Sequence, residues 1–152
     1  MDSLILEPLK YYKSVLKDRH KENLEAQIQL AIAHELVEEP ELSLMIYNKL
    51  IETNPGYLKA YYNKAAMLMG MGDFEEASRT FFQLTKRNPS YYKAYLGMAM
   101  SFDKLGRYNN AIRYYKKFLE LKSLSEDAIF ARQRIKELKE LTIGHTNPLK
   151  LV

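Results

Sequence analysis

The sequence predicts an all-α protein made of consecutive helical hairpins, on three observations. Apolar residues recur at three- and four-residue steps over most of the chain, as they do on one face of an amphipathic helix. Glycine residues and Asn-Pro pairs interrupt these runs at regular intervals. The run from Leu58 to Tyr91 is also repeated thirty-four residues later. With 47% hydrophobic and 28% charged residues, the 152-residue chain has the composition of a folded domain rather than of a disordered tail.

The repeat is defined by residue types at fixed positions. Residues 58–91 have the pattern of two amphipathic helices joined at Met71-Gly72-Asp73 and closed by Asn88-Pro89. The next copy keeps the small, turn and aromatic positions, with Ala94-Tyr95, Gly106, Tyr108, Ala111 and Tyr115 in place of Ala60-Tyr61, Gly72, Phe74, Ala77 and Phe81. A fainter copy precedes them, with Ala26, Ser43, Tyr47 and Asn54-Pro55 in register.

This period, with these residues, resembles the tetratricopeptide repeat (TPR) family. The resemblance extends from Leu24 to Glu140 and implies a right-handed superhelix of three antiparallel helix hairpins with a capping helix at each end. We expect an N-terminal capping helix within 1–23, a degenerate first repeat at 24–57, further repeats at 58–91 and 92–125, a C-terminal capping helix at 126–141 and a flexible tail at 142–152.

The N-terminal cap and the first repeat depart most from the pattern. A helix is expected over residues 7–17, with Pro8 in its first turn, where proline is tolerated. The helices of the first repeat are expected over 21–36 and 40–52. Glu38 occupies the position of the turn glycine, and Pro40 is expected to begin the second helix.

The later helices are predicted over residues 57–71, 74–87, 91–105, 108–121 and 126–141. Gly72 and Gly106 are expected to take positive φ at helix ends, and Ser125 is placed to cap the last helix. The expected packing residues are alanines where helices approach closely, aromatic residues between them, and one apolar face of the last helix: Ala65, Ala77, Ala99 and Ala111; Tyr61, Tyr95, Phe81 and Tyr115; and Ala128, Ala131, Ile135 and Leu138.

The net charge of +4 is unevenly distributed along the chain. Residues 1–57 carry 6 basic and 10 acidic side chains, residues 58–123 carry 12 and 5, and residues 124–152 carry 5 and 4, so the net charges are −4, +7 and +1. Such asymmetry favours an acidic partner for the second half, although solvated lysine-rich faces explain the same count. The absence of cysteine and of a long apolar run favours a cytoplasmic protein that does not insert into a membrane.

Residue patterns typical of catalysis or metal binding are not found in the sequence. The histidines, His20, His34 and His145, lack zinc-ligand spacing, and Glu38-Glu39 and Glu75-Glu76 are adjacent residues whose side chains diverge on a helix. Gly70-Met71-Gly72 lacks the lysine of a phosphate-binding loop. We therefore expect no enzyme activity, no metal and no cofactor.

In TPR proteins the first helices of the hairpins line a concave face that binds peptides. The resemblance implies a peptide-binding face made of Ile28, Gln29, Ile32, Lys59, Tyr62, Asn63, Ala66, Met69, Lys93, Leu96, Gly97 and Met100. A subset of the family uses two Lys, two Asn and one Arg to hold the C-terminal carboxylate of heat-shock chaperones. Only Asn63 and Lys93 match that set, since isoleucine replaces the first Lys and Asn and Gly97 replaces the Arg, so we expect no strong binding of such tails.

The sequence thus favours a protein-interaction module, an adaptor or assembly scaffold, that binds an apolar or acidic amphipathic peptide segment. Two alternatives stay open. In the first, the protein self-associates, and its groove takes a terminal segment of another copy. In the second, an RNA-associated protein uses the basic second half, where tyrosines lie among Lys86, Arg87, Lys93, Arg113, Lys116 and Lys117. Against RNA, those tyrosines match packing positions of the repeat and the net charge is modest.

Overall fold

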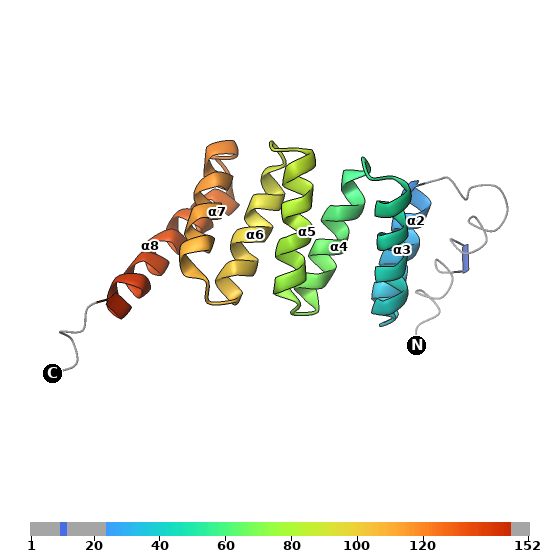
Figure 1. Cartoon of the computed structure of the whole chain (residues 1–152), viewed down its shortest axis with the longest axis horizontal. Coiled ribbons are helices and arrows are strands. Elements are labelled where there is room, and N and C mark those ends of the chain that lie inside the picture. Colours follow the sequence, from blue (N-terminus) through green and yellow to red (C-terminus); the bar gives the residue numbers. More distant parts are fainter. Residues whose placement is uncertain (1–9, 12–23, 147–152) are drawn as a thin grey trace. The chain divides into compact units, whose positions relative to one another are not determined.

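The computed structural model describes residues 10–11 and 24–146, and within these residues every regular element is a helix. Figure 1 labels the helices of the described residues in chain order. They are α2 (Leu24–Leu36), α3 (Pro40–Thr53), α4 (Leu58–Gly70), α5 (Phe74–Arg87), α6 (Tyr92–Lys104), α7 (Tyr108–Leu121) and α8 (Glu126–Thr146). The predicted all-α helical repeat is confirmed, and the bounds of α5 and α7 coincide with the predicted ones. Lys10 and Tyr11 are helical, while the rest of the predicted cap at 7–17 lies outside the described residues.

The chain divides into two compact units, Met1–Met67 and Leu68–Val152. In the first unit α2 packs against α3. Its core joins residues of α2, α3 and α4: Ile28, Ala31, Tyr47, Leu50, Ala60 and Met67. The predicted degenerate repeat therefore shares its hydrophobic core with α4, the first helix of the predicted second repeat.

In the second unit each helix from α5 to α8 packs against the next. The core cluster draws on α6, α7 and α8 and consists of Tyr95, Ala99, Ala111, Tyr115, Phe118, Ala128, Ala131, Ile135 and Leu138. The predicted small and aromatic packing residues are confirmed, because all four alanines are fully buried and the four aromatic side chains are at most 9% exposed. The predicted inner face of the last helix is also confirmed.

The turns between helices explain the glycine positions. Gly72 and Gly106 have φ of 81° and 70°, as predicted. Glu38, which replaces glycine in the equivalent turn of the first repeat, keeps the same left-handed conformation with φ of 59°. Because a side chain is strained there, Glu38 lowers the stability of this turn relative to glycine.

The helix starts follow the residue types seen in the sequence. Pro40 begins α3 as predicted. Ser125 Oγ accepts a hydrogen bond of 3.1 Å from the Ala128 N–H, and Asp73 caps α5 through the Glu76 N–H at 3.2 Å. The end of α8 differs from the prediction, since the helix continues through Gly144 to Thr146 rather than ending at Leu141. One glycine costs a helix only about 1 kcal/mol, which the preceding turns outweigh.

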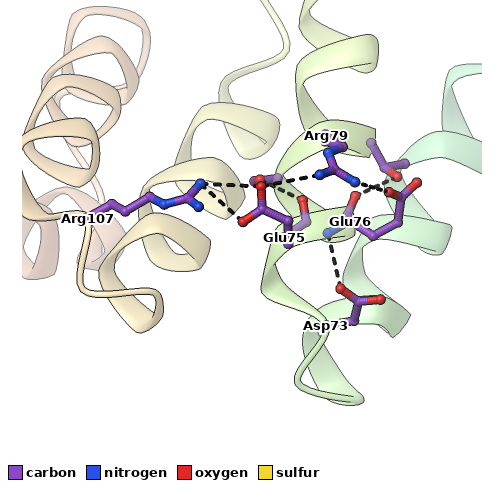
Figure 2. A network of polar contacts seen from close by, with 7 residues as sticks. Asp73, Glu75, Glu76, Arg79 and Arg107 are labelled. Atoms are coloured by element: carbon purple, nitrogen blue, oxygen red, sulfur yellow. Dashed lines mark hydrogen bonds and ion pairs between the residues drawn. The ribbon is translucent and has the colours of Figure 1, made fainter.

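A polar network links the start of α5 to the turn before α7, as Figure 2 shows. Arg107 in that turn lies 3.1 Å from a carboxylate oxygen of Glu75 on α5. Arg79, on the same helix as Glu75, pairs with Glu75 at 3.4 Å and with Glu76 at 3.2 Å. All of these side chains are more than a third exposed, so the network aligns the ends of neighbouring helices and adds little stability.

Candidate peptide-binding surface

On α2, the predicted binding residues differ in how much of each is accessible. Ile28 is fully buried in the core of the first unit and therefore offers no surface to a peptide. Ile32 is half-buried and packs against the same core. Gln29 is also half-buried, and its amide donates a hydrogen bond of 2.9 Å to Glu25. Of the three predicted binding residues on α2, only Ile32 and Gln29 thus leave part of a side chain open.

Lys59, which was predicted to line the peptide-binding face, has an acidic partner within its own unit. Its Nζ lies 2.7 Å from both carboxylate oxygens of Glu25, and the Tyr57 hydroxyl donates to Glu25 at 3.2 Å. The hydrogen bond from Lys59, followed by that from Gln29, lowers the pKa of Glu25. A partner carboxylate would have to compete with Glu25 for Lys59.

The other predicted residues on α4 are Tyr62, Asn63, Ala66 and Met69. Tyr62 and Met69 are half-buried, and Ala66 is exposed. Asn63 hydrogen-bonds the hydroxyl of the buried Tyr47, so its amide serves the fold of the first unit.

Tyr47 is the centre of a polar cluster that the sequence did not reveal. Its hydroxyl donates to Glu35 Oε1 at 2.6 Å, and the Ser43 hydroxyl donates to the same oxygen at 3.3 Å. Burial first, and then the hydrogen bond to Glu35, raises the pKa of Tyr47 well above its ordinary range. The cluster joins α2, α3 and α4 through hydrogen bonds that a buried phenol requires.

In the second unit, α6 presents Lys93, Leu96 and Met100 as predicted surface residues. Lys93 is exposed, and Leu96 and Met100 are half-buried against the core cluster of this unit. Gly97 is buried instead, and a Cβ atom added to it would lie 2.4 Å from two ring carbons of Phe81. This glycine leaves space for the phenyl ring and cannot contact a peptide.

The carboxylate of Asp103, at the end of α6, binds Arg134 of α8. The Arg134 guanidinium donates to Asp103 at 2.7 and 2.9 Å, and the hydroxyl of the buried Tyr115 donates to Asp103 at 3.3 Å. Arg134 also donates to Glu137 at 2.7 Å. Burial, and then the charge of Asp103, raises the pKa of Tyr115, and the hydrogen bond that Arg134 donates to Asp103 raises the pKa of Arg134. This pair fixes α8 against α6.

Helix α8 follows α6 at the same thirty-four-residue period that relates the repeats, although the sequence predicted α8 only as a cap. Thirty-four residues after Leu96 and Met100 come Phe130 and Arg134. Phe130 is 47% exposed and meets Tyr115 edge-on, with ring centroids 6.0 Å apart. Extending the period into the last helix would have identified both residues as candidates for the binding surface.

The comparison with known proteins agrees with this repeat geometry. A family model described as "Tetratricopeptide repeat" matches residues 58–91 and 92–123. The chain contains tetratricopeptide repeats over residues 58–123. Its matched TPRs correspond to the predicted second and third repeats, and the first repeat carries the departures at Glu38 and Pro40.

Solved TPR structures share the fold. MamA from Desulfovibrio magneticus RS-1 is 19% identical with a TM-score of 0.69, over 95% of this chain and 89% of that chain. The Arabidopsis OM64 TPR domain is 22% identical with a TM-score of 0.68, over 76% and 96%. YrrB, described as a TPR protein with an unusual peptide-binding site, is 18% identical with a TM-score of 0.65, over 72% and 57%. Likeness at such identities concerns the fold alone.

One curated protein is similar over a shorter stretch. MJ0572 of Methanocaldococcus jannaschii, itself uncharacterized, is 46% identical over 43 residues, which are 28% of this chain. The chain matches half the length of this relative.

Across residues 10–11 and 24–146, no three acidic or histidine side chains converge as metal ligands would. No helix in that part of the chain has the length and apolarity needed to span a membrane. Of the histidines, His34 is buried with Nδ1 2.6 Å from Glu39, whereas His20 and the side chain of His145 lie outside the part of the chain that the structure describes.

Proposed function

We propose that this TPR protein is a non-catalytic cytoplasmic adaptor or assembly scaffold that binds an apolar or amphipathic peptide segment. The observation that carries the proposal is the row of incompletely covered apolar side chains on α6 and α8. Leu96 and Met100 are half-buried, and Phe130, at the repeat position equivalent to Leu96, is 47% exposed. Partly open apolar side chains on a scaffold of buried alanines and tyrosines are typical of a docking surface.

The chemistry of these residues favours an amphipathic partner. Methionine adapts its shape to different side chains, and Phe130 supplies a rigid apolar contact. Lys93 is exposed on the same helix as Leu96 and Met100 and suits an acidic residue of the partner. Tyr62 and Ile32 provide a further half-buried set in the first unit. The peptide-binding site named for YrrB is a precedent for such binding on this fold.

A chaperone-type carboxylate clamp does not suit this chain. Asn63, one of the two residues that match the clamp, hydrogen-bonds Tyr47. At the position of the clamp arginine stands Gly97, which is buried. Lys93 alone cannot hold a carboxylate in a bidentate manner. The preferred ligand is therefore an internal apolar segment rather than a chain terminus.

Two matched phenylalanine variants test this proposal. Phe130 and Phe82 are 47% and 44% exposed, but only Phe130 lies at the repeat position equivalent to the predicted binding residue Leu96. Proteins captured from native extract by the wild type would be identified and purified, and binding would then be titrated against Phe130→Ser and Phe82→Ser. We expect weaker binding by Phe130→Ser alone, with both variants retaining helical circular dichroism. Equal binding by all three proteins would refute the proposal.

A further inference from the structure

A groove of about 560 Å³ lies along α7, apart from the proposed peptide-binding residues of α6 and α8. Its lining comes from α7 except for Tyr95 of α6, and comprises Tyr95, Asn109, Ile112, Arg113, Tyr114, Lys116, Lys117 and Glu120. Three cations against one carboxylate make the groove basic, and two tyrosines and one isoleucine supply aromatic and apolar surface. We call this feature the α7 groove.

The three cations of the α7 groove differ in their contacts: Arg113 contacts a tyrosine, Lys117 pairs with a glutamate, and Lys116 has neither within the described part of the chain. The Arg113 guanidinium donates to the Tyr114 hydroxyl at 2.9 Å and stacks over the same ring at 4.9 Å. Tyr114 is itself stacked on Phe102, with centroids 5.5 Å apart. Lys117 pairs with Glu120 at 2.7 Å. Lys116 is exposed and has no acidic partner among the described residues.

The preceding repeat provides an internal reference for this charge pattern. At the equivalent positions of α5, Arg79 pairs with Glu75 and Glu76 in its first turn, as Figure 2 shows. In α7 those two glutamates are replaced by Asn109 and Asn110. Arg113 therefore keeps an uncompensated charge where Arg79 is neutralised. The positions of Phe82 and Gln83 are taken in α7 by Lys116 and Lys117, which adds two further cations.

We infer that the α7 groove is a second docking site, which binds an acidic segment of a partner protein. The carboxylates of such a segment would pair with Arg113 and Lys116, and its apolar side chains would rest on Ile112. Arg113 is pre-positioned by Tyr114, so binding a carboxylate costs little side-chain entropy. A protein segment suits the groove better than RNA because Tyr114 is already stacked on Phe102 and covered by the Arg113 guanidinium, and Tyr95 is 9% exposed, so little ring surface is open for stacking with bases.

Fluorescence anisotropy with the full chain tests this inference. The probe is a fluorescein-labelled amphipathic peptide of glutamate, leucine and alanine, and its neutral version replaces each glutamate with glutamine. We expect the acidic peptide to bind at least about tenfold more tightly than the neutral peptide and more tightly than labelled oligouridine. Tighter binding of oligouridine, or no preference for the acidic peptide, would overturn the inference.

Variants locate the binding. Arg113→Glu with Lys116→Glu should weaken binding of the acidic peptide at least about tenfold, whereas Lys136→Glu with Lys139→Glu, an equal charge change on exposed residues of α8, should change it less than about threefold. Equal losses in both pairs would indicate general attraction by the net charge and would overturn the site.

A second variant separates docking from folding. Asn109→Glu with Asn110→Glu gives Arg113 the two acidic neighbours that Arg79 has in α5. Glutamates in the first turn of a helix are favourable, so the free energy of unfolding of this variant should be at least that of the wild type. Binding of the acidic peptide should nonetheless fall at least about tenfold. Unchanged binding would contradict a role for the uncompensated Arg113.

Discussion

Replacing Gly97 with alanine should destabilise the second unit, although alanine is the better helix former. The added Cβ would lie 2.4 Å from Cε2 and Cζ of Phe81 and 2.9 Å from its Cδ2, well inside ordinary carbon contacts of about 3.5–4.0 Å. Phe81 is only 2% exposed, so its ring has little space into which to move. Overpacking costs about 1–3 kcal/mol, whereas removing glycine from a helix gains about 1 kcal/mol. We therefore expect a net loss of up to about 2 kcal/mol in the free energy of unfolding.

The pair of residues can be separated by a double-mutant cycle. Phe81→Leu shortens the side chain that faces Gly97. In that background Gly97→Ala should become neutral or stabilising by up to about 1 kcal/mol, because only the helix propensity remains. The coupling energy between the two positions should thus be about 1–3 kcal/mol, within the range for residues in contact.

Urea unfolding followed by circular dichroism measures these differences, with the m-value checked for constancy. Gly144→Ala is the control, because nothing lies within 4 Å of a Cβ at this helical glycine and no clash is expected. The reasoning would be refuted if Gly97→Ala stabilised the wild type as Gly144→Ala does, or if the coupling energy were near zero.

Three further predictions concern the turns and polar clusters. Glu38→Gly should raise the free energy of unfolding by about 0.5–1 kcal/mol, since φ of 59° suits glycine, and a lower urea midpoint would contradict this. Asp103→Asn should destabilise by about 1–2 kcal/mol, because Arg134 loses an ion pair whose carboxylate is 13% exposed, whereas Arg79→Gln should cost less than about 0.5 kcal/mol in the same assay. Burial and Asp103 raise the pKa of Tyr115, so the folded state keeps this proton while the unfolded chain releases it above its ordinary value of 10.0. The free energy of unfolding should therefore fall as the pH rises above about 10. In urea titrations this fall should be smaller for Tyr115→Phe than for the wild type. A fall of equal size in both proteins would contradict the prediction.

Much of the fold could be predicted from the sequence because its determinants are local or periodic. Gly72 and Gly106 end helices by a backbone conformation that depends on the residue itself, and both were predicted. Buried alanines and tyrosines recur with the repeat, so the packing residues identified in one repeat predict those of the other repeats. The length of α8 could not be predicted, because Gly144 breaks the pattern but its cost is smaller than the gain from continuing the helix.

The binding surface could be predicted only in part, since accessibility depends on what packs from neighbouring helices. The periodicity places Ile28 and Gly97 on the surface. In the structure the core of the first unit covers Ile28, and Phe81 covers Gly97. Asn63 has a hydrogen-bonding partner, Tyr47, that no local pattern specifies. Phe130 was missed because the last helix was interpreted only as a cap.

A methyl spectrum of the protein labelled at its methionines tests the peptide-binding surface most directly. Met100 lies on that surface, whereas Met45 and Met71, which are 59% and 51% exposed, lie outside it and serve as references in the same sample. On addition of the purified partner, the Met100 methyl resonance should shift while those of Met45 and Met71 stay in place. A shift of Met45 or Met71 with Met100 unchanged would contradict the proposed surface.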